Sequence, residues 1–260
     1  MIDLQLPKVK VLDVSLYGGD IPSASALIIQ KCQEQERADL CISATGAHGM
    51  VFSKKNPFFK STLDAFFLNL PDGMPGVWVG RIKGASKMRR CYGPDVFKYL
   101  MEKTSDQPIT HFFCGGNPGV ADELKLAVAR KFKNHNVVGT YCPPYLPVEK
   151  YNYDEIALQI KSTNPDIIWI GLSTPKQELF ALNLRGKAKG HFIITVGAAF
   201  DFHTDKVAQA PALMQKLSLE WLFRLVMEPR RLYKRYLEIV PLFVIYNVKE
   251  LIKFALSQKK

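Results

Sequence analysis

Several well-known site signatures are absent from this sequence. Its five cysteines include no CxxC pair, and its five histidines show neither an HExxH nor an HxH spacing. An odd number of cysteines without such pairs argues against a disulfide framework or a zinc site, and favours free thiols in a reducing compartment. The DxD sequence that carries Mg²⁺ or Mn²⁺ in many nucleotide-sugar enzymes is missing too. We therefore expect neither a metal ion nor a cofactor.

The standard phosphate-binding and nucleophile loops are also missing. The chain contains no GxGxxG fingerprint, no GxxxxGK[ST] loop and no GxSxG turn. These absences argue against a nucleotide-dependent oxidoreductase and against a P-loop enzyme.

Long apolar runs are absent as well. The longest near the C-terminus is IVPLFVIY, residues 239–246, which is far shorter than the roughly 20 residues that a membrane-spanning helix needs. The first ten residues, MIDLQLPKVK, hold no extended apolar stretch of the kind found in signal peptides. We expect a cytoplasmic protein, although one that can lie on a membrane surface.

Positive charge is what the sequence has in excess. The net charge of the 260 residues is +11, and residues 81–103 and 205–260 supply all of it, with +5 and +6. A basic surface suits nucleic acid, anionic lipid or phosphate-bearing substrates, and a merely soluble basic surface is the simpler alternative. No nucleic-acid-binding motif is present, so we expect no nucleic-acid partner.

Segments typical of strands and helices alternate along most of the chain. The strand-like segments are VKVLDVSLY, DLCISAT, FLNL, ITHFFC, NVVGTYC, DIIWIGL and HFIITVG. This alternation predicts an α/β fold, a Rossmann-like, mostly parallel sheet with helices on both faces. The continuous apolar character of DIIWIGL and HFIITVG is typical of strands buried on both sides.

The pattern changes after residue 204. Residues 213–256 have helical spacing and no further strand, and Pro229 and Pro241 should each start or kink a helix. We predict an α/β core over residues 1–204 and a basic, helical C-terminal appendage over residues 205–260.

Three loops fall at carboxyl ends of predicted strands, where open parallel sheets bind ligands. In the first, FFCGGNPGVADEL, Gly115, Gly116 and Gly119 lie between a strand and a helix. Glycines let the backbone approach a ligand, and a helix N-terminus attracts phosphate. A tight strand-to-helix turn with no ligand explains the same pattern equally well.

The second loop is GLSTPKQELF. Lys176, Gln177 and Glu178 fall in the first turn of a predicted helix, where a lysine opposes the helix dipole and hints at an anionic ligand. Gln177 can donate and accept hydrogen bonds, as base or sugar recognition requires. The simpler alternative is a solvated first turn.

The third loop is LNLPDGMPGVWVGR. It places Asp72 on a constrained turn where a strand ends, which is a suitable position for a general base. Aspartate is also common in turns and at helix starts, so Asp72 could instead cap a helix that begins near Met74. A further loop, SATGAHG, brings Thr45 and His48 to a strand end, where His48 could line the site.

The C-terminal segment mixes arginines with aromatic and aliphatic residues. Arg224, Arg230 and Arg231 lie within LEWLFRLVMEPRRLYKRYL. Arginine forks suit phosphate oxygens, and this mixture is typical of a helix on an anionic membrane surface. A solvated charged face on a helix packed against the core is the alternative.

Taken together, the motifs resemble the WecG/TagA/CpsF glycosyltransferases. LPDGMPGVWVGR, FFCGGNPGVADE, PDIIWIGLSTPKQE, VGAAFDF and the C-terminal arginine segment stand in the family's order, from about residue 40 to about residue 243. The resemblance implies transfer of a sugar, with inversion and without a metal, from a UDP-sugar to a polyprenyl-diphosphate-linked saccharide at the cytoplasmic face of the inner membrane. The products are teichoic acid linkage units, common antigen, capsule or exopolysaccharide.

The resemblance also implies roles for residues. Asp72 matches the proposed catalytic base, and Gln177, with Lys176 and Glu178, matches the nucleotide-sugar pocket. The matching motifs further imply substrate contacts at Thr45, Gly73, Arg81 and Asp201, and lipid-diphosphate contacts at Arg224, Arg230 or Arg231.

One departure from the family falls at the loop after Thr45. Many members carry Asn two residues after this threonine, whereas this chain has Ala47. This departure leaves the donor sugar open. The sequence also does not determine the acceptor glycan or the oligomeric state, a homo-oligomer included. A non-catalytic nucleotide- or lipid-diphosphate-binding protein is the competing class, because it would need the glycine loop and the basic helix but no acid at residue 72.

Overall fold

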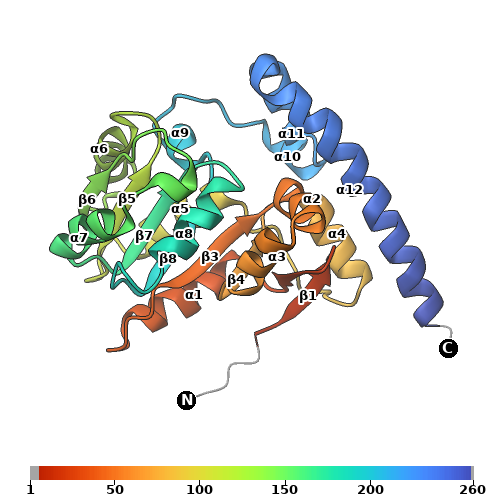
Figure 1. Cartoon of the computed structure of the whole chain (residues 1–260), viewed down its shortest axis with the longest axis horizontal. Coiled ribbons are helices and arrows are strands. Elements are labelled where there is room, and N and C mark those ends of the chain that lie inside the picture. Colours follow the sequence, from red (N-terminus) through yellow and green to blue (C-terminus); the bar gives the residue numbers. More distant parts are fainter. Residues whose placement is uncertain (1–5, 259–260) are drawn as a thin grey trace.

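The computed structural model describes residues 6–258, apart from the side chains of Ala212, Lys216 and Arg231. It contains an eight-stranded sheet in the order β1-β2-β4-β3-β8-β7-β5-β6 (Figure 1). Neighbouring strands are parallel except for the pair β1–β2. The strands are β1 (Lys8–Val11), β2 (Val14–Tyr17), β3 (Leu40–Thr45), β4 (Leu68–Pro71), β5 (His111–Gly115), β6 (Val137–Tyr141), β7 (Ile167–Gly171) and β8 (Phe192–Thr195).

The prediction of a single strand for the first segment is wrong. VKVLDVSLY is a hairpin of β1 and β2 rather than a single strand. Leu12 and Asp13 both have positive φ, 49° and 65°, as the two central residues of a type I′ turn require. The Leu12 side chain is buried, and its main-chain N–H donates to Glu250 near the C-terminus. Long-range contacts therefore support a turn that the local sequence does not announce.

Helices cover both faces of the sheet, as predicted. One face carries α1 (Ile21–Cys32), α5 (Gly93–Lys103), α6 (Val120–Phe132) and α9 (Ala199–His203). The other carries α7 (Tyr153–Thr163) and α8 (Lys176–Leu184), with α2 (Ala47–Lys55) and α3 (Pro57–Asp64) beside them. Strand β7 shows why both faces need cover, because Ile167 and Trp169 enter one apolar cluster and Ile168 and Ile170 enter the other.

The C-terminal segment is helical, as predicted, and packs on the core. It comprises α10 (Ala212–Lys216), α11 (Glu220–Met227) and α12 (Pro229–Ser257). Pro229 begins α12, whereas Pro241 lies inside it. Ile239 and Phe243 of α12 enter an apolar cluster with β1, β2, α2, α3 and α4 (Met74–Ile82), and Figure 1 shows α12 along this flank. Within the described residues, no helix has both the length and the apolar character that crossing a membrane requires.

Candidate active site

The candidate site lies at the carboxyl edge of the sheet, where strands β3 and β4 end together. Thr45 and Pro71, the last residues of these strands, are paired in register. The main-chain N–H of Asp72 donates to the main-chain oxygen of Thr45 (3.2 Å). The carboxyl ends of the parallel strands β3, β4, β5, β7 and β8 all lie at this edge. Open α/β sheets bind their ligands beyond the carboxyl ends of the strands.

Asp72 is held from two directions at this point. Its Oδ1 accepts a hydrogen bond from the main-chain N–H of Gly93 (2.8 Å), the first residue of α5. Its Oδ2 lies beside Gly46, at the start of α2, since a Cβ on Gly46 would come within 3.3 Å of it. Helix α4 has Gly73 as its N-cap and no side-chain capping bond. The alternative prediction that Asp72 caps α4 is therefore wrong.

The surroundings of Asp72 shift its acidity. Burial raises the pKa of the Asp72 carboxyl to about 6, and Arg90, the Gly93 hydrogen bond and Arg224 oppose this rise. The charge of Glu220 raises the pKa further. A carboxylate with this pKa is mostly ionised at neutral pH and is still basic enough to accept a proton during a reaction.

Arg90 is a site residue that the sequence did not reveal. Its Nε donates to the main-chain oxygen of Asp72 (2.8 Å), and its Nη2 forms an ion pair with Glu220. Its guanidinium lies 4.0 Å from the ring centre of Tyr92. Arg90 falls in the basic segment 81–103, but its distance from Asp72 in the sequence gave no sign of contact. Only the path of the chain from α4 to α5 brings it back to the turn.

The predicted lipid-diphosphate arginines are spread over two helices. Arg224 in α11 lies close enough to Asp72 to lower the pKa of its carboxyl, and its guanidinium is 5.6 Å from the Phe202 ring centre. Arg230 is exposed in the first turn of α12. The side chain of Arg231 lies outside the described residues. Arg224 is therefore the member of this set that the structure brings to Asp72.

The glycine loop is a tight strand-to-helix turn. Gly115, Gly116 and Gly119 all have positive φ, at 130°, 76° and 83°. A Cβ on Gly115 would lie 2.7 Å from the main-chain oxygen of Gly171. Backbone conformation and close approach thus both require glycine here. The turn lies at the same edge of the sheet as Asp72, and its contact with a substrate stays a prediction.

Gln177 and Glu178 lie beneath this edge and are both buried. Glu178 Oε1 accepts hydrogen bonds from Ser43 Oγ (3.1 Å), Thr174 Oγ1 (2.9 Å) and Gln177 Nε2 (2.9 Å). Gln177 Oε1 accepts one from the main-chain N–H of Gly197 (3.0 Å). These bonds tie α8 to β3 and to the turn after β8, so the pair fixes the shape of the edge. Direct contact with a nucleotide sugar stays a prediction for both.

Lys176 of the GLSTPKQELF loop and Thr45 and His48 of the SATGAHG loop differ in their surroundings. Lys176 is partly exposed, and its Nζ lies over the rings of Tyr145 (4.7 Å) and Tyr151 (5.1 Å). Thr45 is buried, and its Oγ1 donates to Ser43 Oγ (3.0 Å). Burial is the main cause that lowers the pKa of His48 to about 4, and the charge of Arg235 of α12 is a further cause. His48 is therefore neutral at pH 7 and lies near the junction of α2 and α12.

Three other predicted residues occupy different places. Gly73 adjoins Asp72 as the N-cap of α4. Arg81 is in the last turn of α4, roughly 10 Å along the helix from its start, and its Nε donates to the main-chain oxygen of Met88 (2.9 Å). Asp201 lies in α9, which follows β8. The structure thus places Gly73 at the edge and directs Arg81 to a neighbouring turn.

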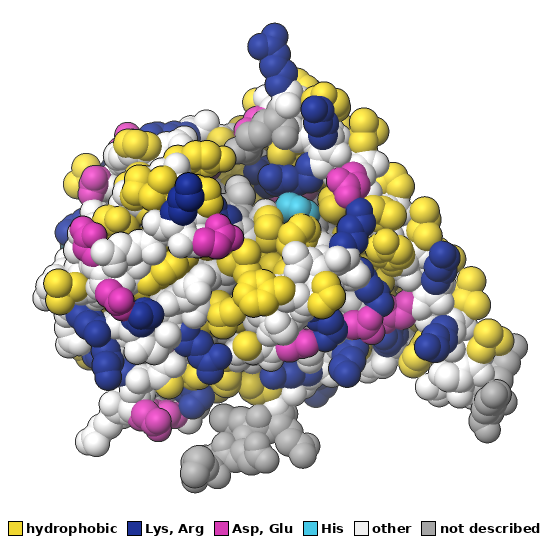
Figure 2. All heavy atoms as spheres, viewed as in Figure 1, with side chains coloured by type: hydrophobic (Ala, Val, Ile, Leu, Met, Phe, Trp, Pro, Cys, Tyr) yellow, Lys and Arg dark blue, Asp and Glu magenta, His cyan; other side chains and the backbone are white. Residues whose placement is uncertain are grey.

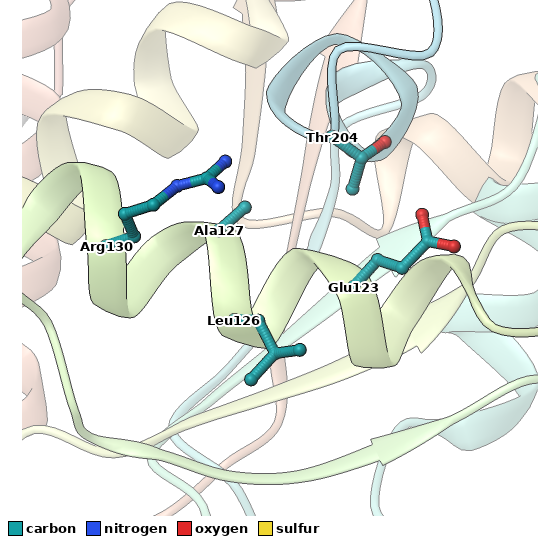
Figure 3. A pocket seen from close by; sticks show the side chains of 5 residues that line it. All are labelled: Glu123, Leu126, Ala127, Arg130 and Thr204. Carbon is teal, nitrogen blue, oxygen red and sulfur yellow. The ribbon is translucent and has the colours of Figure 1, made fainter.

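One pocket lies away from this edge. It has a volume of about 360 Å³ and is lined by Glu123, Leu126, Ala127 and Arg130 of α6, with Thr204 after α9 (Figure 3). None of the predicted site residues lines it. Across residues 6–258, no group of three or more His, Cys, Asp and Glu side chains is placed to hold a metal ion. Independence of metal stays a prediction.

Fold and site together define a doubly wound α/β protein with a carboxylate and two arginines at the carboxyl edge of its sheet. The sequence model described as "Glycosyl transferase WecG/TagA/CpsF family" matches residues 9–256. The chain belongs to this glycosyltransferase family.

Two similar relatives carry the same name, N-acetylglucosaminyldiphosphoundecaprenol N-acetyl-beta-D-mannosaminyltransferase. The one from Bacillus subtilis is 31% identical over 181 residues, which cover 70% of this chain and 68% of the relative. The one from Bacillus spizizenii is 29% identical over 185 residues, 71% of this chain and 70% of the relative.

Proposed function

We propose that this protein transfers a hexose-type sugar from a UDP-sugar, with inversion, to a polyprenyl-diphosphate-linked saccharide during synthesis of a cell-surface polysaccharide. One observation carries the proposal. Asp72 stands at the carboxyl edge of the sheet, burial raises the pKa of its carboxyl to about 6, and Arg224 lies near it. A base with a cation near it matches a reaction that removes a proton and releases a diphosphate.

The reaction is a single displacement. Asp72 takes the proton of the acceptor hydroxyl. At the same time the oxygen of that hydroxyl bonds to the anomeric carbon of the donor sugar. The bond from that carbon to the UDP oxygen breaks on the opposite face, and UDP leaves with the bonding electrons. Arg224 and the N–H groups at the glycine turn can stabilise the charge on the diphosphate without a metal. Arg90 pairs with Glu220 and holds the main chain of the turn that carries the base.

The relatives supply the first substrate pair to examine. Their name specifies N-acetylmannosamine as the transferred sugar and N-acetylglucosaminyl diphosphoundecaprenol as the acceptor. This chain has Ala47 where many members of the family carry asparagine. We therefore extend the donor screen from UDP-N-acetylmannosamine to other UDP-hexoses.

The same proposal puts the enzyme on the cytoplasmic face of the inner membrane. Helix α12 exposes apolar side chains at Leu237, Val244, Val248 and Ile252, and the basic residues Lys249 and Lys253 lie among them. Figure 2 shows apolar and basic side chains together on this flank of the molecule. A helix with this composition suits the interface of an anionic membrane, where a polyprenyl-linked acceptor is held.

The test of the catalytic role is Asp72→Asn. We expect kcat to fall by about 10²- to 10⁴-fold, the usual contribution of a general base, while UDP-sugar binding measured by calorimetry stays close to wild type. Asp106→Asn removes an exposed carboxylate that precedes the amino end of β5, at the opposite end of this strand from the site, and serves as the control. Turnover is followed as UDP release in the presence of the lipid-linked acceptor.

Two results would contradict the proposal. Near-normal turnover by the Asp72→Asn variant removes Asp72 from the role of base. If the wild-type protein binds UDP-sugars and lipid diphosphates but transfers no sugar in any pair, the protein is the non-catalytic binding protein considered above.

A further inference from the structure

Glu220 is an acidic residue that the sequence analysis did not single out. It is the first residue of α11, and its side chain is 14% exposed. Its partner is Arg90, whose side chain is 16% exposed, so the two form a largely buried ion pair between the C-terminal segment and the core. A buried pair of this kind fixes geometry, because breaking it leaves an uncompensated charge.

The guanidinium of Arg90 is engaged on every side. Nε donates to the main-chain oxygen of Asp72 (2.8 Å), and Nη2 is paired with Glu220. Nη1 donates to Gln215 Oε1 (3.4 Å), and the face of the group lies over Tyr92. Glu220 thus determines where Arg90 stands, and Arg90 in turn holds the turn that carries Asp72.

We infer that Glu220 is a positioning residue for the catalytic base: it fixes Arg90 against the main chain of Asp72 and sets a second negative charge beside that carboxylate. The inference rests on the proposed role of Asp72 as the base. It gives the C-terminal segment a second task besides lipid contact, namely to complete the surroundings of the base.

The charges around Asp72 determine the direction of the effect. The titratable and charged groups that face it are Arg90, Tyr92, Cys91, Glu220 and Arg224. Arg90 and Arg224 lower the pKa of Asp72, and Glu220 raises it. The base must be ionised, so turnover is lost as pH falls through its pKa. Removing the charge of Glu220 lowers that pKa and moves the acid limb of the rate profile to lower pH.

The experiment is a pH profile of kcat for the full-length chain carrying Glu220→Gln. We expect the acid limb to move down by about 0.5 to 1 pH unit, the size of a screened interaction between partly buried charges. At the plateau we expect kcat to fall about tenfold, because Arg90 and the turn are less firmly placed, with the donor KM changed less than twofold. Glu238→Gln removes a carboxylate of α12 that pairs with Lys55 and should leave the profile unchanged.

A second variant, Glu220→Asp, keeps the negative charge on a side chain that is shorter by one methylene group. Glu220→Asp should leave the acid limb at the wild-type pH while the plateau still falls. Wild-type profiles for both variants would overturn the inference, and the loss of turnover in Asp72→Asn would then still support the proposed function. Thermal unfolding shows whether Glu220→Gln folds. If it does not fold, a wild-type plateau in Glu220→Asp is by itself enough to overturn the inference. Normal turnover in Asp72→Asn would instead remove Asp72 from the role of base, on which this inference rests.

Discussion

Asp72 and Glu178 are two carboxyls whose different surroundings give them different tasks. Burial raises the pKa of both. Arg90 and Arg224 lower that of Asp72, whereas hydrogen bonds from neutral donors surround Glu178. One oxygen of Glu178 has no hydrogen-bond partner among the described residues. Burial thus favours the neutral acid at Glu178, while the three hydrogen bonds to its other oxygen lower its pKa. A buried carboxyl held by three donors suits a structural link.

This difference predicts how Glu178 affects stability. Its folded pKa lies above the ordinary value of 4.5, so its contribution to stability is present at low pH and is lost as pH rises through the folded value. A glutamine at this position resembles the protonated acid and does not ionise. Glu178→Gln should therefore remove this loss of stability at higher pH. The wild-type free energy of unfolding should thus fall, relative to that of Glu178→Gln, as pH rises above the ordinary glutamate value of 4.5 in urea titrations.

Glu178→Ala is the companion variant. It leaves Ser43, Thr174 and Gln177 without their shared acceptor, and we expect it to destabilise the protein by about 2 to 4 kcal/mol. Parallel pH dependence in wild type and Glu178→Gln would show that folding does not raise the pKa of Glu178.

Residue-scale prediction from the sequence succeeded where the signal was local. A carboxylate directly after a strand placed Asp72 at the sheet edge, because a strand end in a parallel sheet determines the location. Arg90 and Glu220 had no such signal. Their link to Asp72 depends on two chain reversals, and no pattern in the sequence encodes the distance between them.

At the scale of elements, the start of α5 is the part that holds the Asp72 side chain. Gly93 is the first residue of α5, and its N–H donates to Asp72 Oδ1. A Cβ at this position would lie 2.8 Å from the main-chain oxygen of Val196 and 3.3 Å from the Cβ of Ala44. Glycine therefore allows α5 to begin directly over the ends of β3 and β8.

Replacing Gly93 should disturb this arrangement. In Gly93→Ala the helix start must shift away from main-chain atoms, which lengthens the bond to Asp72. We expect kcat to fall about 10- to 100-fold, as small displacements of catalytic groups do, with a modest loss of thermal stability. Gly76→Ala, in α4, is the control, since its Cβ would meet the flexible end of Met50. Equal activity of the two variants would argue against this role for α5.

Helix α2 shows why some elements were not predicted. The pattern of GAHGMVFSKKN predicts neither a helix nor a strand, yet a helix of nine residues forms within this segment. Its N-cap, Gly46, supplies no side-chain bond, and Gly49 lies inside it, so local propensity is weak. Packing compensates, because Gly49 lets the helix approach Thr45 and Thr174 and Met50 and Val51 are buried.

At the scale of the whole molecule, the two basic segments of the sequence meet in space. Lys83 of the first pairs with Glu250 of α12 and lies 6.0 Å from the ring centre of Phe254, and Arg90 pairs with Glu220. The C-terminal segment uses its acidic residues for these contacts with the core. Its exposed face is consequently left more basic than its composition suggests. Alternation of strands and helices predicted the core well, but it could not predict this docking, which depends on pairs far apart in the chain.

The way α12 is docked also decides how membrane contact should be examined. Deleting residues 205–260 would uncover the apolar cluster that contains Ile239 and Phe243 and would break the contacts of Glu250. Loss of binding after such a deletion could then reflect unfolding. Substitutions on the exposed stripe of α12 avoid this problem, since Leu237, Val248 and Ile252 are largely exposed.

We expect a variant with Leu237, Val248 and Ile252 all changed to serine to bind anionic vesicles at least tenfold more weakly than wild type, because each buried apolar side chain contributes about 1.5 kcal/mol or more to insertion. Leu126→Ser with Leu158→Ser, two exposed apolar residues of α6 and α7, should bind like wild type. Binding is measured by co-sedimentation with vesicles containing an anionic phospholipid.

Wild-type binding should also weaken as salt rises, since basic side chains near an anionic surface are screened within about 10 Å at 0.1 M salt. Binding that resists both changes would mean that another surface meets the membrane, because neither the apolar stripe nor the basic charge around it would then supply the attraction.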